Sequence, residues 1–380
     1  NTKFEFSHMT KRTVYHACQH DCPDNCAMES IVENGKVQAV GGRKDHPFTR
    51  GSLCSKVKRY DQRVYSDERI MFPMRRIGAK GEGQFQRVSW DEALDEVSFK
   101  FKESIKMHGA ESILPCSYLG HQGLLNGLHC GDRFFNEIGA SIGERTFCNA
   151  TASKAFQLVA GPTGGLDPET FKFSDLIIVW GMNPIATSIH HSQFILEAKK
   201  KGAILVVIDP IKTDTAKRAD LHLRLRPGTD GALACAVMHI LFRDGLADWG
   251  YLRKYSDDPQ GLAEHLQMRT PAWAASITGL SVSEIEQFAE LYGSNLRSFL
   301  RLGYGFTRSR NGAPNMHAVS CLPIVTGAWQ YPGGGALYSN SGMCPFDVSE
   351  IKGLDRLDPS KRVLDQSRIG PILCGHPQDL

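Results

Sequence analysis

The chain has 380 residues, enough for two or three domains of about 150 residues each. With 44 Lys and Arg residues against 41 Asp and Glu residues, its net charge of +3 is too small to attract nucleic acid through overall electrostatics. Hydrophobic residues make up 41% of the chain, yet no apolar stretch approaches the roughly 20 residues of a membrane span, so we expect a soluble, globular protein with no membrane span.

Cysteine usage points to a reducing compartment. The chain contains 11 cysteines, an odd number, whereas a secreted disulfide framework usually has an even number in a much shorter chain. Residues 1–9 lack the apolar core of a secretion signal. We therefore expect a cytoplasmic protein whose cysteines serve some purpose other than disulfide formation.

The first part of the chain reads as a small sheet. Short β-prone runs occur at residues 14–18, 27–32 and 36–40, and Asn34-Gly35 between the last two predicts a tight hairpin. Further along, Ser89 and Glu92 form a capping-box pattern, which predicts a helix over residues 90–106.

From residue 173 the pattern changes to alternating strands and helices. Apolar runs at 175–180 and 203–208 predict buried strands, and helical patterns occur at 191–201, 230–244 and 281–292. This order is typical of a βαβ unit whose ligand-side loops follow the strands. Residues 327–335 and 351–380 read as loops.

Four cysteines near the amino terminus have the spacing of a metal site. Cys18, Cys22 and Cys26 are each separated by three residues, and Cys54 follows after 27 more. Four soft thiolates suit an iron-sulfur cluster or zinc, and three clustered cysteines with one distant cysteine favour a [4Fe-4S] cluster. Lys56 lies two residues beyond the last of them.

Several short motifs follow the cysteines in a fixed order. They are Trp180-Gly181-Met182-Asn183-Pro184, Ile208-Asp209-Pro210, Arg226-Pro227-Gly228-Thr229-Asp230, Gly303-Tyr304-Gly305 and a glycine loop ending at Gly335. Together with the cysteine pattern, this series resembles the molybdopterin oxidoreductases of the dimethyl sulfoxide reductase family. The resemblance covers nearly the whole chain.

The resemblance implies a small N-terminal β-rich [4Fe-4S] domain at residues 9–65, followed by doubly wound, Rossmann-like α/β domains. It implies an α/β domain at 66–143, continued incompletely by 319–380, and a dinucleotide-binding domain at 144–318. The family's C-terminal pterin-binding barrel is absent from these residues.

The cofactors implied by the resemblance are a [4Fe-4S] cluster and a molybdenum or tungsten ion carried by two molybdopterin guanine dinucleotides. The cluster ligands would be the four cysteines named above, and Lys56 would lie between cluster and pterin. The predicted dinucleotide contacts are Gly181, Asn183, Pro184, Asp209, Thr229, Asp230, Gly303, Tyr304 and Gly305. Thr229 and Asp230 are also candidates for a helix N-cap, and Tyr304 for an ordinary core residue.

The resemblance further implies that Cys148 is the protein ligand of the heavy metal, although a buried structural cysteine is the alternative. Family members that oxidise formate carry a histidine after this ligand and an arginine in a later helix. This chain has Asn149 at the first of these places and, in approximate register, His317 at the second. Both differences weigh against formate. His190 and His191 are further candidates for contact with cofactor phosphate or substrate.

The expected function is two-electron redox chemistry on a small oxyanion, an S- or N-oxide or a sulfur compound, with electrons passing through the cluster to a partner protein or subunit. A non-catalytic iron-sulfur subunit, similar to the cluster-bearing large subunit of respiratory NADH dehydrogenase, is the first alternative. A zinc-stabilised interaction domain is the second.

Overall fold

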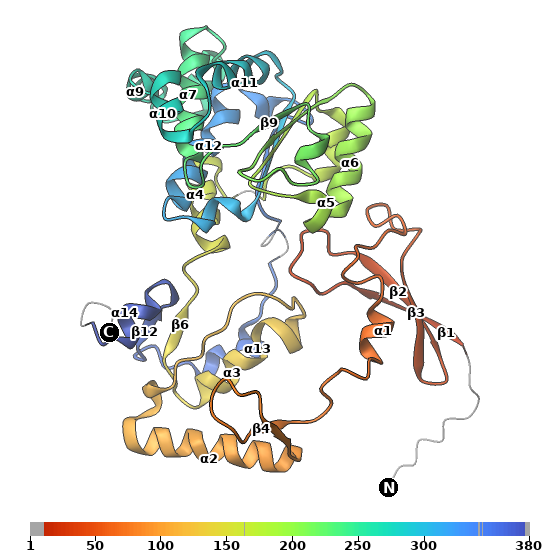
Figure 1. Cartoon of the computed structure of the whole chain (residues 1–380). Helices are drawn as coiled ribbons and strands as arrows, with labels where there is room; N and C mark the ends of the chain where they lie inside the picture. Colours follow the sequence, from red (N-terminus) through yellow and green to blue (C-terminus); the bar gives the residue numbers. More distant parts are fainter. Residues whose placement is uncertain (1–10, 163, 341–342, 344, 377–380) are drawn as a thin grey trace. The chain divides into compact units, whose positions relative to one another are not determined.

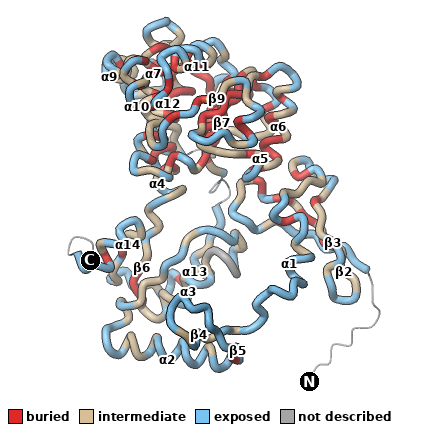
Figure 2. The backbone as a smooth tube through the Cα atoms, viewed as in Figure 1, coloured by how far each residue is buried: buried red, intermediate tan, exposed pale blue. Residues whose placement is uncertain are grey.

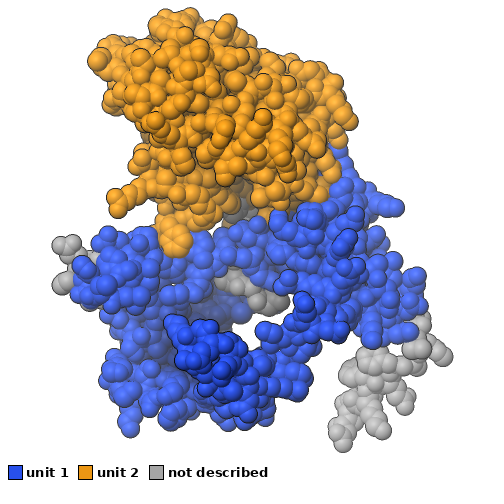
Figure 3. All heavy atoms as spheres, in the orientation of Figure 1, with its two compact units in different colours: residues 1–21, 25–145, 346–380 blue, residues 22–24, 146–345 orange. Residues whose placement is uncertain are grey.

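A computed structural model describes residues 11–162, 164–340, 343 and 345–376. Within the first of these ranges, only the backbone is described for residues 126–128. The chain forms two compact units (Figure 3). Unit 1 comprises residues 1–21, 25–145 and 346–380, and unit 2 comprises residues 22–24 and 146–345. Residues 1–10, on which the expectation about a secretion signal rested, lie outside the described part.

Unit 1 begins with the predicted small sheet. Its three antiparallel strands are ordered β1-β2-β3, and the turn joining the last two contains Asn34 with φ 55° and Gly35 with φ 74°. Two consecutive residues with positive φ are what a type I′ hairpin turn requires, which explains the Asn-Gly pair. The strands are β1 (Arg12–Ala17), β2 (Ala27–Glu33) and β3 (Lys36–Gly42).

The predicted capping-box helix of unit 1 is confirmed. The amide of Glu92 donates to Ser89 Oγ at 3.1 Å, and Glu92 Oε2 accepts from the amide of Ser89 at 2.7 Å, so both residues cap the first turn. The helices and strands around it are α1 (Tyr60–Val64), β4 (Met74–Arg76), β5 (Phe85–Arg87), α2 (Trp90–His108), η1 (Ala110–Ser112), η2 (Leu124–His129), α3 (Cys130–Glu137) and β6 (Ile142–Glu144).

The prediction of a loop over residues 351–380 is wrong for the described residues. Three residues of this segment form a strand that pairs in parallel with β6, and Leu364 at its centre is buried. The elements are α13 (Ser349–Lys352), η7 (Leu354–Arg356), β12 (Val363–Asp365), η8 (Gln366–Arg368) and α14 (Ile369–Leu373).

Unit 2 is built on a five-stranded parallel sheet with strand order β11-β10-β7-β8-β9. Strands β7 and β8 are continuous apolar runs, as expected where helices cover both faces of a parallel sheet, whereas β9 contains His222 and β10 contains Arg301. The chain moves outward in one direction through β8 and β9 and in the other through β10 and β11, so the topological switch point lies between β7 and β10. They are β7 (Leu176–Trp180), β8 (Ile204–Ile208), β9 (Leu221–Leu223), β10 (Ser298–Leu302) and β11 (Gly335–Leu337).

Helices cover both faces of this sheet, with α6 on one side and α7 and α12 on the other (Figure 1), which confirms the doubly wound α/β class. The helices before β9 are α4 (Asn149–Ala160), η3 (Pro168–Phe173), α5 (Pro184–Thr187), α6 (Ile189–Lys200) and η4 (Ala216–Arg218). Those after it are α7 (Asp230–Arg243), α8 (Trp249–Tyr255), α9 (Pro259–Leu266), α10 (Pro271–Thr278), α11 (Val282–Ser294), η5 (Tyr304–Arg308), α12 (Gly312–Val325) and η6 (Ala328–Gln330).

Two details of unit 2 differ from the sequence prediction. The predicted domain boundary at residue 318 lies inside α12, and residues 319–345 belong to unit 2 because this helix and β11 complete its core. The predicted loop at 327–335 contains the short helix η6 and the start of β11.

Burial is concentrated in unit 2, where the buried residues gather around the sheet (Figure 2). Its core includes Trp180, Leu233 and Phe288, each 0% exposed. Every helix within the described ranges falls short of the length or the hydrophobicity of a membrane span.

Candidate functional site

Three of the four predicted cluster cysteines share one small core in unit 1. Cys26 is 6% exposed and packs with Met28 and Val57, and Cys18 and Cys54 pack against the same core. The amide of Cys18 donates to the carbonyl of Cys26 at 2.8 Å, which closes the loop between them. Thiolates gathered in this way are the donor set of an iron-sulfur cluster, so the residues fit the predicted group.

The fourth cysteine, Cys22, belongs to unit 2, where its Sγ lies 3.2 Å from the carbonyl oxygen of Thr187. Lys56 is exposed in the turn of unit 1 that follows Cys54. The amides of Val57 and Lys58 both donate to the carbonyl of Cys54, at 3.2 and 3.1 Å, so this turn fixes Lys56 two residues from a predicted ligand.

At the switch point of unit 2, glycines allow two loops to touch. Gly181 follows β7 with φ 64°, and its carbonyl accepts the amide of Gly305 at 3.0 Å. A Cβ on Gly303 would lie 2.3 Å from the Gly181 oxygen, and one on Gly305 would lie 2.8 Å from it. Glycine is therefore required at 303 and 305 for contact between the loops, whatever else binds there.

The loops after β7 and β8 are linked by side chains. The Thr215 hydroxyl donates to Asn183 Oδ1, and Pro184 begins α5 directly after Asn183. Asp209 follows β8, and its Oδ1 accepts the amide of Ile211 at 2.8 Å. Burial raises the pKa of Asp209. Thr215 was not predicted, because a lone threonine in a loop has no distinctive sequence signal.

Asp230 is held by other residues of unit 2. Its carboxylate accepts from Trp180 Nε1 at 2.7 Å and from Asn315 Nδ2 at 3.3 Å, and burial raises its pKa. Thr229 occupies the N-cap position of α7 without capping the helix through its side chain, and its hydroxyl donates to the carbonyl of Arg226 at 2.6 Å. Asp230 therefore has a structural role in joining β7, α7 and α12.

Cys148 has an unusual backbone conformation for a residue with a side chain. Its φ of 62° places it outside the ordinary regions, immediately before α4. Non-glycine residues with such φ values are strained by about 1–3 kcal/mol and cluster at functional sites. Asn149 begins α4, and its Oδ1 accepts from the Ser153 hydroxyl at 3.0 Å.

Two tyrosines lie close to this position. Tyr338 is 2% exposed, and its hydroxyl has no hydrogen-bond partner in the described part of the chain. Burial raises the pKa of Tyr338, and negative charge on Tyr304 and Cys148 raises it further. Tyr304 packs edge-on against Tyr338, with ring centroids 5.3 Å apart, and its hydroxyl lies 3.2 Å from Ser339 Oγ. A strained thiol whose charge acts on an unsatisfied buried hydroxyl fits a site for a metal-bound group.

The predicted histidines occupy quite different places. His317 is exposed on α12, where its backbone carbonyl accepts from Cys321 Sγ at 3.3 Å. His190 and His191 are 0% and 1% exposed on α6. Their partners include Asp24 and Arg301, which sequence reasoning missed although an arginine within an apolar strand is a recognisable signal.

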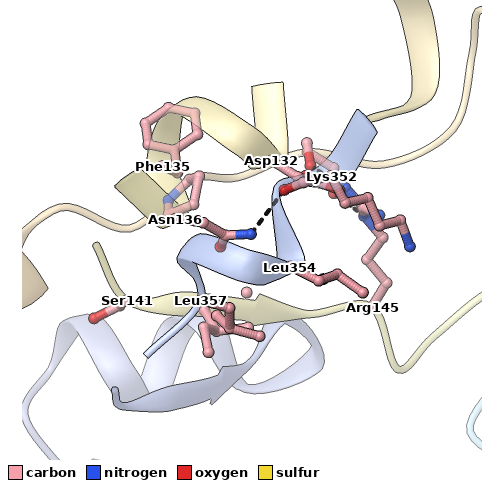
Figure 4. A pocket seen from close by; sticks show the side chains of 12 residues that line it. Asp132, Phe135, Asn136, Ser141, Arg145, Lys352, Leu354 and Leu357 are labelled. Atoms are coloured by element: carbon pink, nitrogen blue, oxygen red, sulfur yellow. Dashed lines mark hydrogen bonds and ion pairs between the residues drawn. The ribbon is translucent and has the colours of Figure 1, made fainter. Parts of the chain in front are cut away.

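Unit 1 also contains a pocket of about 200 Å³ (Figure 4). Arg145, which lines it, donates to Ser117 Oγ at 2.6 Å and to Asp132 Oδ1 at 3.3 Å, so its charge is already paired. Asn136 Nδ2 donates to the carbonyl of Lys352 at 2.9 Å across the same pocket. Ligand pockets usually measure about 300–1,000 Å³, so this one is too small for a dinucleotide.

Comparison with known proteins gives two family matches. Residues 11–66 match the molybdopterin oxidoreductase Fe4S4 domain, and residues 69–367 match molybdopterin oxidoreductase. Probable oxidoreductase YoaE of Bacillus subtilis is 38% identical over 357 residues, covering 94% of this chain and 52% of that protein. Dimethyl sulfoxide reductase DmsA of Escherichia coli is 28% identical over 369 residues, covering 83% of this chain and 44% of that protein.

Acetylene hydratase from Pelobacter acetylenicus has a similar fold, with a TM-score of 0.70 at 23% identity, covering 90% of this chain and 47% of that one. The chain thus spans about half the length of the relatives that it matches. Since the two family matches together extend from residue 11 to residue 367, the chain belongs to the molybdopterin oxidoreductases of the dimethyl sulfoxide reductase family.

Proposed function

We propose that this chain carries the cluster and part of the dinucleotide-binding site of a molybdenum- or tungsten-dependent oxidoreductase. Its cofactors would be a [4Fe-4S] cluster and two molybdopterin guanine dinucleotides, and its partner a protein or subunit that exchanges electrons with the cluster. The bound metal would supply two-electron redox chemistry, and the cluster would pass electrons one at a time.

The observation that carries this proposal is the edge of the sheet in unit 2. Gly181, Asp209 and Gly303 follow β7, β8 and β10, three neighbouring strands, at their carboxyl ends on either side of the switch point. Ligands of doubly wound sheets bind at this place, where backbone amides and a carboxylate can meet phosphate and a base. The same chain carries the four cysteines that suit an iron-sulfur cluster.

Particular residues would have particular tasks. The loops of Gly181 and Gly303 would let backbone approach the dinucleotides closely, and Asp209 would accept hydrogen bonds from a guanine or ribose. Cys148 would donate its thiolate to the metal, and the hydroxyl of Tyr338 would donate a hydrogen bond at that site. Lys56, exposed and cationic beside Cys54, would stabilise negative charge along the electron path.

For the substrate we propose a small oxyanion, an S- or N-oxide or a sulfur compound. Asn149, bonded to Ser153, provides no permanent cation that could bind a carboxylate. His317, exposed on α12, adds none either. Formate is therefore disfavoured as the substrate, although one relative, of Methanococcus maripaludis, is an F420-dependent formate dehydrogenase subunit with 26% identity over 83% of this chain.

The test is metal analysis with an optical spectrum of the protein purified without oxygen. We expect about four iron atoms per chain, with molybdenum or tungsten also present. Iron without either heavy metal would instead support the non-catalytic electron-transfer subunit. Zinc alone, in a colourless protein, would overturn the proposal and support a zinc-stabilised domain.

A further inference from the structure

A buried chain of polar side chains in unit 2 takes no part in the proposed cofactor contacts. Asp24 accepts hydrogen bonds from the Ser188 hydroxyl at 2.6 Å and from the amide of His190 at 2.9 Å, and it lies 2.8 Å from His190 Nδ1. His191 Nε2 lies 3.9 Å from Asp24 Oδ1. These four residues are 0–5% exposed, so water does not screen the carboxylate.

Arg301 provides the opposite charge at the other end of this chain. It lies on β10, is 3% exposed, and its Nε donates to His191 Nδ1 at 3.0 Å. Its Nη1 donates to the carbonyls of Leu302, Leu337 and Tyr338 at 2.5, 3.2 and 2.9 Å. A guanidinium buried in this way is held in one position by four acceptors.

The two ends of the network differ in charge. Burial lowers the pKa of Arg301 to about 10, which leaves the guanidinium protonated. At the other end, Asp24 accepts from the Ser188 hydroxyl and from the amide of His190, which are donors that suit a carboxylate. His191 stays neutral between them, because burial and Arg301 lower its pKa to about 3.

The network reaches a predicted cluster ligand. Cys22 lies two residues before Asp24, and its Sγ is 3.2 Å from the carbonyl of Thr187, the residue before Ser188. One short turn of unit 2 therefore holds both Cys22 and Asp24.

We propose that Arg301 is a positioning residue that raises the reduction potential of the iron-sulfur cluster through the network reaching Cys22, and that Asp24 acts in the opposite direction. This inference rests on the proposed function, because it requires the cluster.

The direction follows from charge. Reduction adds one electron to the cluster, so a nearby positive charge favours the reduced state and a negative charge favours the oxidised state. Charges in a low-dielectric interior act far more strongly than charges at the surface. Arg297, which lies immediately before the same strand, is exposed and forms two 2.7 Å bonds with Asp175, so solvent screens its charge.

The experiment measures the cluster's midpoint potential by an electron paramagnetic resonance titration of the holoprotein. We expect Arg301→Gln to lower the potential and Asp24→Asn to raise it, each by at least a tenfold change in the oxidised-to-reduced ratio at fixed potential, about 59 mV for a one-electron couple. Arg301→Lys, which keeps the charge, should move the potential least of the Arg301 variants. The double variant should return toward the wild-type value, and Arg297→Gln should leave it unchanged.

A purely structural role predicts a different pattern. In that case the variants lose iron in proportion to their loss of stability, and the clusters that remain titrate at the wild-type potential, a result that would overturn the inference. Shifts of the same sign in Arg301→Gln and Asp24→Asn would also overturn it. If no Arg301 variant assembles a cluster, Asp24→Asn decides alone, and an unchanged or lower potential contradicts us.

Failure of the proposed function is distinguishable from failure of this inference. A wild-type protein without iron would refute the proposed cluster and the inference together. A wild-type protein with a reducible cluster whose potential ignores both substitutions would refute only the inference.

Discussion

Helix α2 of unit 1 and helix α7 of unit 2 use apolar residues in opposite ways. All 19 residues of α2 lie outside the buried class, and Trp90 and Leu94 are 64% and 58% exposed. In α7, seven of the 14 residues are buried, among them Leu233 at 0% exposure. Unit 2 therefore covers its own apolar surface, whereas α2 leaves apolar side chains such as Trp90 and Leu94 exposed and packs Phe101 against Phe134 and Phe135. Helix α2 thus depends more on local features such as its capping box.

The largest expected effect is the loss of packing in unit 2. Leu233→Ala should lower the free energy of unfolding by about 2–5 kcal/mol, because it leaves a cavity in a closed core. Leu94→Ala, the same substitution on α2, should change it by less than about 0.5 kcal/mol. Urea unfolding followed by circular dichroism measures both, and equal effects would contradict the contrast between the helices.

The next effect concerns the loops at the switch point. Gly303→Ala should destabilise the protein by about 1–3 kcal/mol, because the new Cβ would overlap the Gly181 carbonyl and the Met182 side chain. Gly131→Ala on α3 of unit 1 meets nothing within 4 Å and should stabilise the helix by up to about 1 kcal/mol. Unfolding midpoints of the two variants should therefore move in opposite directions, and a harmless Gly303→Ala would show that the loops do not need glycine.

The buried network of unit 2 should make stability depend on pH. His191, which faces Asp24, Arg301 and His190, has its pKa lowered to about 3 from an unfolded value of about 6.5. Between these values the unfolded chain binds a proton that the folded chain does not, so stability falls as pH falls, by at most about 1.4 kcal/mol per pH unit. The lowered pKa of Asp24 adds a further loss of stability only when the pH falls below 3.8, the ordinary pKa of an aspartate.

Urea unfolding between pH 7 and pH 5 isolates the histidine. The free energy of unfolding should change less with pH in His191→Gln than in the wild type, because glutamine can still accept a hydrogen bond from Arg301 but cannot titrate. An equal dependence of the unfolding free energy on pH in the two proteins would contradict this account.

A smaller effect is expected at Cys148. Cys148→Gly should stabilise the metal-free chain by about 1 kcal/mol relative to Cys148→Ala, since only glycine adopts a φ of 62° without strain. The same substitution should abolish the signal of the heavy metal in the holoprotein. Thermal unfolding of the two metal-free variants measures the difference, and equal stability would remove the argument from strain.

The contrast between the units also shows what a sequence can predict. Strands β7 and β8 of unit 2 are uninterrupted apolar runs, and the Asn34-Gly35 turn and the Ser89 cap of unit 1 are local signals, so these elements were predictable. Strand β12 was not, because three residues carry little periodicity and their partner β6 is more than 200 residues away. The boundary at residue 318 was an expectation from the family resemblance and not from a pattern in the chain.

The same distinction holds for the candidate site. The four cysteines and the glycine motifs could be found because each is a short pattern in the chain. Arg301 could have been noticed as an arginine within an apolar strand, but its link to Asp24 and His191 could not, since the three are distant in sequence and meet only in the folded chain. The unpaired hydroxyl of Tyr338 could not be predicted from the sequence either, because it is tertiary packing that buries this hydroxyl away from hydrogen-bond partners.

The most direct test compares two cysteine variants of the full holoprotein. In our account Cys54→Ser disrupts the iron-sulfur cluster and lowers the iron content, whereas Cys148→Ser leaves iron unchanged and alters the spectrum of molybdenum or tungsten. Metal analysis and paramagnetic resonance of both variants beside the wild type therefore separate the two centres. If Cys148→Ser leaves the heavy-metal spectrum unchanged, or Cys54→Ser retains all of its iron, the assignment of two metal centres to these cysteines is wrong.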